Sequence, residues 1–183
     1  MSEEALVKYC SPTLAGIKTG SLFSCSYHSQ AELSAFLRTW NIALRGKGIR
    51  IIPLRIKEGK ALIYVYRPSQ LKSRLQENDS RDLLEERGYS SESCSRCLTH
   101  LIRRLSRSED FPHEIGLFLG YPCEDARGFI DNKAACAKCV GCWKVYGDEE
   151  KAKKQFERFK KCTRIYQQQW ADGKPLTRLT VAR

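Results

Sequence analysis

Three evenly spaced cysteines are the side chains of this sequence best suited to chemistry. Cys136, Cys139 and Cys142 form a Cys-x2-Cys-x2-Cys run. A gap of two residues lets neighbouring thiolates converge on one ion, which is why zinc and iron–sulfur sites use it. Such sites normally take four ligands, and Cys162 or Cys123 could supply the fourth. The run therefore predicts a zinc or iron–sulfur site; the alternative is a set of unligated thiols, with Cys142 in a buried strand.

A His-Glu pair, His113 and Glu114, lies in a loop before an apolar segment, where catalytic groups are commonly placed. His113 could act as a general base for a thiol nucleophile, with Glu114 as the group that orients it. The nucleophiles open to this hypothesis are Cys10, Cys25 and Cys139. The structural alternative is that His113 caps the preceding helical region and Glu114 pairs with an arginine.

Two further motifs are each open to two interpretations. Gly16, Lys18 and Gly20 indicate a loop in which the backbone could approach an anion, although the lysine precedes the second glycine and so does not form a P-loop. Cys94 and Cys97 form a Cys-x2-Cys pair, which can bind metal or carry out redox chemistry. They extend the apolar face of a helix, so we expect them in the core.

The charge of the chain suggests an anionic partner. The formal net charge is +11 over 183 residues, and the densest basic segment is Lys151–Arg164. Cations with Trp143 and Tyr146 upstream would suit single-stranded nucleic acid or a nucleotide. However, Phe156 and Phe159 fall on the buried stripe of this helix, and the alternative is a solvated surface. Nucleic-acid binding is therefore the third hypothesis.

Composition favours a single globular domain over residues 1–183. Hydrophobic residues make up 42% and charged residues 29% of the chain, as in ordinary globular proteins. No apolar run reaches the roughly 18–20 residues of a membrane span, and the N-terminus has no apolar signal-peptide core. We expect a cytoplasmic protein that does not enter a membrane, in which nine cysteines stay reduced.

The clearest structural signals are a helix start and a hairpin. Ser29 and Glu32 form a capping box before an amphipathic helix. The segments Ile49–Ile56 and Ala61–Arg67 flank a short connection with a glycine, which predicts a β-hairpin. Pro53 predicts that the first of these strands lies at a sheet edge or carries a bulge.

The remaining segments combine strands and helices. We expect a first helix at residues 3–10 that ends at Ser11-Pro12, and a helix from Pro122 to about Asp131. Further expected helices cover residues 69–77, 81–87, 92–107 and about 148–166. Further expected strands are Ser21–Tyr27, Ile115–Leu119, Cys142–Tyr146 and, in a C-terminal tail or edge strand within 167–183, Leu176–Ala182. The fold class is therefore α/β or α+β, a single domain with a mixed, hairpin-containing sheet and several packed helices.

Three long passages resemble one bacterial family. They are CSPTLAGIKTGSLF (Cys10–Phe23), FPHEIGLFLGYPCEDARGFI (Phe111–Ile130) and CVGCWKVYGDEEKAKKQFERFKKC (Cys139–Cys162). They are similar to the family of anaerobic Gram-positive bacteria catalogued as domain of unknown function 3793. The resemblance implies redox or metal metabolism, with a redox partner such as flavodoxin. It also implies that the family's recurring positions include Cys10, Lys18, His113, Glu114, Cys139, Cys142 and Cys162.

These observations rank three functions. The leading hypothesis is a cysteine-rich protein that holds zinc or an iron–sulfur centre, or acts as a thiol redox partner, with Cys136, Cys139, Cys142 and Cys162 as ligands. The alternative is a thiol-dependent enzyme that uses Cys10 or Cys139 with His113 and Glu114. The third is a nucleic-acid- or nucleotide-binding module.

Overall fold

The chain forms two compact units in a computed structural model that describes residues 2–90, 92–107 and 111–182. Unit 1 comprises Met1–Ser69 and Phe159–Arg183, and unit 2 comprises Gln70–Arg158. Among the described residues, no helix combines the length and the apolar character needed to cross a membrane.

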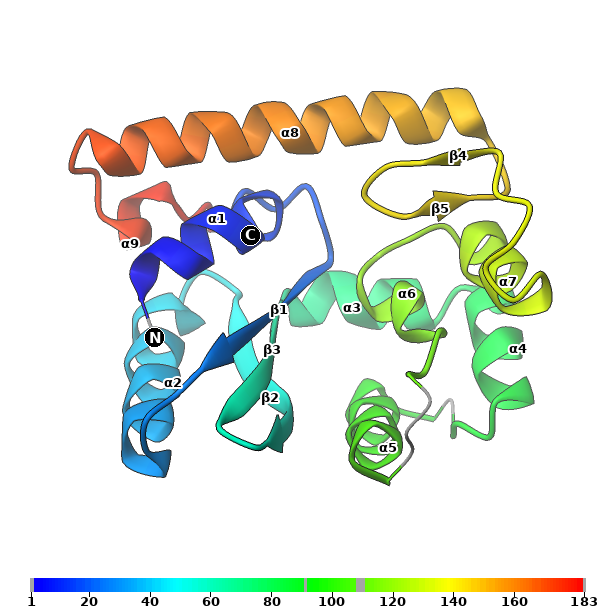
Figure 1. Ribbon diagram of the computed structural model, residues 1–183, viewed down its shortest axis with the longest axis horizontal. Helices are drawn as coiled ribbons and strands as arrows, with labels where there is room; N and C mark the ends of the chain where they lie inside the picture. The colour runs from blue at the N-terminus through cyan, green and yellow to red at the C-terminus, as the bar shows by residue number, and fades with distance from the viewer. Residues whose placement is uncertain (1, 91, 108–110, 183) are drawn as a thin grey trace. The chain divides into compact units, whose positions relative to one another are not determined.

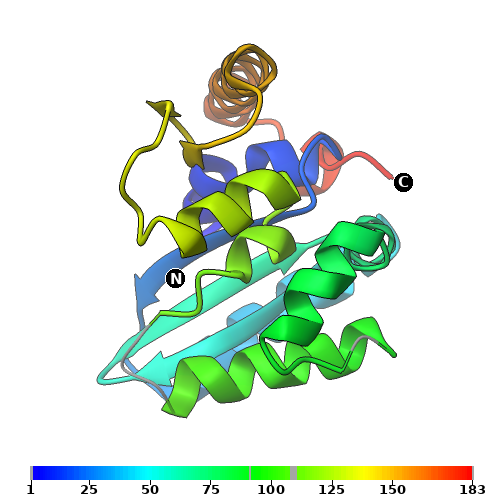
Figure 2. The ribbon, with the colours of Figure 1, turned by 90° about the vertical axis from the view of Figure 1, so that its right-hand side faces the viewer.

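Unit 1 is built on a three-stranded sheet with the order β1-β3-β2 (Figure 1; Figure 2). Its strands are β1 (Gly20–Ser26), β2 (Arg50–Lys57) and β3 (Lys60–Tyr66), and both pairings are antiparallel. A fold that combines helices with a hairpin-containing sheet is confirmed. The sheet contains antiparallel pairs only, where a mixed sheet was expected, and this places the fold in the α+β class.

The predicted β2–β3 hairpin is confirmed, and its turn explains it. Glu58 and Gly59 both have positive φ angles, 51° and 72°, as a two-residue type I′ turn requires. β2 lies at the sheet edge, and its register shifts between Pro53 and Arg55. The prediction from Pro53 is therefore also confirmed, because a residue without an N–H is tolerated at an edge or a bulge.

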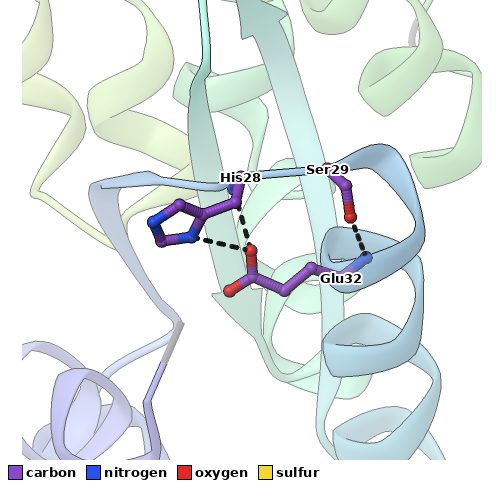
Figure 3. A network of polar contacts seen from close by, with 3 residues as sticks. All are labelled: His28, Ser29 and Glu32. Atoms are coloured by element: carbon purple, nitrogen blue, oxygen red, sulfur yellow. Dashed lines mark hydrogen bonds and ion pairs between the residues drawn. The ribbon is translucent and has the colours of Figure 1, made fainter.

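The capping box predicted at Ser29 starts helix α2 (Gln30–Arg45) (Figure 3). The Ser29 hydroxyl accepts a hydrogen bond from the Glu32 backbone N–H at 3.1 Å. The Glu32 carboxylate accepts a bond from the backbone N–H of His28 at 2.8 Å, one residue before the cap. The first contact satisfies a donor that a helix start leaves without an intrahelical partner. The second differs from the usual capping box, in which the carboxylate accepts from the cap residue's own N–H; here it holds the residue before the cap.

Helix α1 (Glu3–Leu14) continues past the end predicted at Ser11-Pro12. Proline within a helix removes one backbone hydrogen bond and disfavours the helical conformation of the residue before it. Here Ser11, Pro12, Thr13 and Leu14 are all buried. Packing of this last turn outweighs the local cost of the proline, which a local sequence rule does not include.

The core of unit 1 lies between α1, α2, the sheet and the C-terminal segment. Its fully buried members include Leu6, Cys10, Leu44 and Ile63. Tyr166 of helix α8 (Glu149–Ala171) and Leu176 of helix α9 (Leu176–Leu179) complete the same cluster. The strand predicted at Leu176–Ala182 is therefore wrong: its first four residues form a helix, and Arg183 lies outside the described residues.

Unit 2 consists mainly of helices and one short ribbon. The helices are α3 (Pro68–Leu75), which begins in unit 1, α4 (Asn78–Glu86), α5 (Cys94–Arg107), α6 (Ile115–Phe118), α7 (Cys123–Asp131) and the first part of α8. The strands β4 (Cys139–Val140) and β5 (Lys144–Val145) pair antiparallel. The helix predicted after Pro122 is confirmed, and Gly88 follows α4 with a φ of 80°.

The strand predicted at Ile115–Leu119 is wrong, because this segment forms α6. All four residues of α6 are buried. An apolar run that is buried on every side has no periodicity, so a strand and a short helix give the same pattern. The strand predicted at Cys142–Tyr146 is confirmed only for Lys144 and Val145.

Candidate functional site

Unit 2 contains an open cavity of about 430 Å³, a volume within the range of small-molecule sites. Its lining comes from α6 and the residues around it, from α7 and from the β4–β5 ribbon (Figure 1). The lining residues are Phe111, His113, Ile115, Gly116, Leu119, Tyr121, Asp125, Ala126, Phe129, Val140, Gly141, Cys142, Trp143 and Lys144. We call this cavity the aromatic pocket.

Aromatic rings form much of its wall. The Tyr121 and Trp143 rings stack with centroids 4.8 Å apart and an interplanar angle of 25°. Trp143 also meets Phe156 edge to face at 4.5 Å, and His113 lies 4.8 Å from Phe129. Ring pairs at these separations stabilise one another beyond the area that they bury, so the wall is held in place before any ligand binds.

Asp125 holds two sides of the aromatic pocket together. Its carboxylate is buried and accepts hydrogen bonds from the Trp143 indole N–H at 2.6 Å and from the backbone N–H groups of Tyr146 and Gly147 at 2.7 and 2.8 Å. A buried carboxylate is tolerated only when such donors surround it. Asp125 therefore positions the Trp143 ring. Its place in the first turn of α7 is the only sequence signal for it.

Two glycines allow rings to approach the backbone closely. A β-carbon at Gly141 would lie 2.2 Å from the Phe156 ring, and one at Gly116 would lie 3.1 Å from the Tyr121 ring. Separations below about 3 Å are overlaps that the surrounding core would have to relieve. The missing side chain at Gly141 is thus a requirement of the ring arrangement.

Lys144 and Tyr121 add polar groups to the wall. The Lys144 ammonium donates a hydrogen bond to the Ala134 carbonyl at 2.7 Å and lies 5.8 Å from the Phe129 ring centroid. Tyr121 donates to the Cys142 carbonyl at 3.3 Å. Burial, together with the nearby Cys142, raises the pKa of Tyr121 to about 12, so its hydroxyl stays protonated at neutral pH. Lys144 is not among the residues predicted from the sequence, because a lone lysine in a short strand carries no signal.

The His-Glu pair divides between two environments. His113 is exposed and lines the aromatic pocket. Glu114 is buried, accepts a hydrogen bond from the Tyr89 hydroxyl at 2.7 Å and pairs with Arg104 at 2.6 Å. Burial and the Glu114 carboxylate both raise the pKa of Tyr89. Glu114 thus pairs with an arginine, as its structural alternative predicts, while His113 meets the pocket.

The cysteine run lies at the ribbon but does not form a closed ligand set. Cys142 is exposed and lines the aromatic pocket, Cys139 is half-buried beside the small cluster around Phe156, and Cys136 is exposed with a φ of 57°. Within residues 2–90, 92–107 and 111–182, no three His, Cys, Asp or Glu side chains are placed to hold one ion. The zinc or iron–sulfur site stays a prediction, which elemental analysis of protein purified without oxygen would check.

Cys162, Cys10 and the predicted anion loop belong to unit 1, whereas Cys123, the other possible fourth ligand, is half-buried at the start of α7 in unit 2. Cys162 packs against the core of unit 1. Cys10 has no exposed surface, and burial raises the pKa of its thiol, which opposes formation of the thiolate that a nucleophile needs. In the predicted anion loop, Gly16 has a φ of 74°, Lys18 lies over the Phe159 ring at 5.8 Å, and Gly20 pairs with Tyr66. Lys18 thus contacts an aromatic ring within its own unit.

The Cys94–Cys97 pair follows the core interpretation in part. Cys97 is 2% exposed and its thiol donates to the Ser90 carbonyl at 3.3 Å. Cys94, at the first position of α5, is half-buried, and burial raises the pKa of its thiol to about 11. Thiols that hold their protons this strongly are poor nucleophiles at neutral pH.

Comparison with known proteins gives a family match. Residues 6–180 match the family described as "Protein of unknown function (DUF3793)". No curated protein and no solved structure matches the chain. Since the match covers nearly all of the sequence, including both the aromatic pocket and the core of unit 1, the chain belongs to this family.

Proposed function

We propose that the protein binds a small, planar and largely apolar molecule in the aromatic pocket, where it meets the thiol of Cys142. The observation that carries this proposal is the lining itself. Side chains from separate segments enclose about 430 Å³ with aromatic and aliphatic groups and only a few polar ones. Ligand sites are typically concave and mostly apolar in this way.

The polar groups of the wall suggest the chemical class of the ligand. Asp125 is already committed to three donors of the protein, so it has little capacity left for a ligand. Lys144 keeps a positive charge at the wall, and His113 is exposed there. An aromatic ring system with one anionic substituent would satisfy both the rings and the ammonium group.

The mouth of the aromatic pocket is apolar as well. Val140 is 71% exposed and Phe111 is 38% exposed, and both line the pocket. Exposed apolar side chains that gather at one opening commonly mark a binding site. Of the nine cysteines, all of which lie among the described residues, Cys142 alone lines the pocket. This supports a thiol-dependent function in which Cys142 acts with His113, and not the predicted set of Cys10, His113 and Glu114.

Anilinonaphthalene sulfonate, which carries a planar naphthalene ring system and one anionic sulfonate, is a suitable probe. We expect its fluorescence to rise on binding, and Val140→Glu to weaken that binding about tenfold or more because a carboxylate would then stand at the apolar mouth. Ile42→Glu is a matched control, since Ile42 is 69% exposed and lies on α2 of unit 1. Equal binding by the wild type and both variants would contradict the proposal.

The role of Cys142 has its own test. With the probe bound, we expect alkylation of Cys142 by iodoacetamide to slow several-fold, as measured by peptide mass spectrometry. Cys136 is the internal control, because it is exposed but does not line the pocket. Equal protection of both thiols, or of neither, would remove Cys142 from the site.

A further inference from the structure

Helix α5 presents a row of basic residues that do not line the aromatic pocket. Arg96, His100, Arg103 and Arg107 follow one another at intervals of four, three and four residues, and residues so spaced lie on one face of a helix. At a rise of 1.5 Å per residue, the row is about 16 Å long. We call it the α5 basic row.

Two adjoining hollows lie along the α5 basic row. The first, of about 390 Å³, is lined by Ser90, Ser95, Arg96, Thr99, His100 and Arg103. The second, of about 450 Å³, is lined by His100, Arg103, Arg104 and Arg107. They share His100 and Arg103, so together they form one continuous, hydroxyl- and guanidinium-lined surface within unit 2.

Contacts with other side chains of unit 2 hold His100 of the row, and the neighbouring Arg104, in position. Arg104 is held by its 2.6 Å ion pair with buried Glu114. The His100 ring stacks on the Tyr89 ring, with centroids 4.1 Å apart. Burial and the nearby Arg104 lower the pKa of His100, so the positive charge of the row at neutral pH comes from its arginines. Arg96 forms an ion pair with Glu92, which leaves Arg103 and Arg107 as the main source of that charge. Arg103 and Arg107 are exposed and present that charge to solvent.

We propose that the α5 basic row binds the phosphate backbone of nucleic acid. Guanidinium groups and hydroxyls donate hydrogen bonds to phosphate oxygens. Among the described residues, the lining of the two hollows includes no apolar side chain that would anchor a peptide or a lipid. A single phosphate would occupy one hollow only. A row of about 16 Å matches several consecutive phosphates, since each nucleotide of one strand advances by about 3.4 Å along the axis of a duplex. The net charge of +11, counted over the whole chain, also favours a polyanionic partner.

This site differs from the one that the sequence indicated. The densest basic segment lies on α8, where Lys154 and Lys161 are exposed. Those lysines line neither hollow. The two helices can therefore be compared directly by variants that remove the same charge.

The test is fluorescence anisotropy of an end-labelled duplex, titrated with wild-type protein, Arg103→Gln/Arg107→Gln and the control Lys154→Gln/Lys161→Gln. We expect binding by the wild type to weaken steeply between about 50 and about 200 mM salt. The α5 variant should bind about tenfold or more weakly, and its slope of log affinity against log salt should be smaller by nearly two. The control should bind almost as the wild type does. All three should melt at the same temperature, because the altered side chains are exposed.

Three results would overturn the proposal. The first is no binding by the wild type at low salt. The second is an equal loss in the two variants, which would assign binding to net charge alone. The third is that tripolyphosphate, at the same phosphate concentration, releases the duplex and binds the protein as tightly as the duplex does. That result would assign the row to a small phosphate ligand.

Discussion

Arg104 and Glu114 form an ion pair in which a guanidinium nitrogen lies 2.6 Å from a carboxylate oxygen that is otherwise enclosed by protein. The Glu114 side chain is 2% exposed, whereas that of Arg104 is 34% exposed. The pair thus joins a buried charge to a partner that reaches solvent. It also connects the loop beside the aromatic pocket to the helix that carries the α5 basic row.

Removal of this carboxylate should destabilise the fold. We expect Glu114→Ala to lower the free energy of unfolding by about 3 kcal/mol, because it leaves Arg104 and the Tyr89 hydroxyl without their acceptor. Urea denaturation measures this change. The control is Glu86→Ala, whose pair with Arg127 is exposed and should contribute far less to stability. Equal losses of the free energy of unfolding in Glu114→Ala and Glu86→Ala would show that burial of the carboxylate does not decide the cost of removing it.

Arg67 is another buried charged residue, and backbone carbonyls accept its hydrogen bonds. Its guanidinium is 1% exposed and donates to the carbonyls of Thr13, Leu14, Lys47 and Val181. Arg67→Met should lower the free energy of unfolding by about 4 kcal/mol, since several buried acceptors lose a charged donor at once. Chemical denaturation of Arg67→Met and of the exposed control Arg45→Met would check this. If Arg67→Met lowers the free energy of unfolding by less than about 1 kcal/mol, the hydrogen bonds from Arg67 to these carbonyls do not stabilise the fold as proposed.

Gly141 should not tolerate a side chain. Gly141→Ala is expected to cost about 2 kcal/mol of stability and to weaken probe binding, because its β-carbon would overlap the Phe156 ring beside the aromatic pocket. Thermal melting and probe titration measure the two effects. Gly46→Ala is the control: nothing lies within 4 Å of its added β-carbon, and its φ is −64°. An unchanged melting temperature for Gly141→Ala would contradict this prediction, because it would show that the Phe156 ring can move away from the added β-carbon at little cost.

Stability should fall at alkaline pH. Burial raises the pKa of Cys94 to about 11 and the pKa values of Tyr121 and Tyr166 to about 12, above the usual values of about 8.5 for cysteine and about 10 for tyrosine. The folded protein therefore keeps protons that the unfolded chain releases. The free energy of unfolding must decrease as pH rises from about 9 towards 12. Urea denaturation at about pH 8 and about pH 10.5 would show this fall, and a constant stability would contradict it.

Local signals in the sequence predicted the elements whose causes are local. The Ser29 cap, the β2–β3 hairpin and the bulge near Pro53 depend on residues within a few positions of one another, so short-range rules find them. The α5 stripe also follows from its period, which placed Cys97 in the core. The errors fall where burial decides. Ile115–Leu119 and Leu176–Ala182 are short apolar runs, and only their surroundings choose between helix and strand.

Residue types and spacing group the chemically able side chains into a few clusters: a His-Glu pair, a cysteine run and several basic segments. Which of these clusters share a site follows from the packing of the folded chain. In the folded chain, His113 and Cys142 line one aromatic pocket, Glu114 forms a buried ion pair with Arg104, and Cys10 lies in the core. The physical reason is that spacing along the chain defines a side chain's neighbours only within one helix turn or hairpin. Contacts such as Asp125 with Trp143 form when separate segments pack to bury their apolar faces.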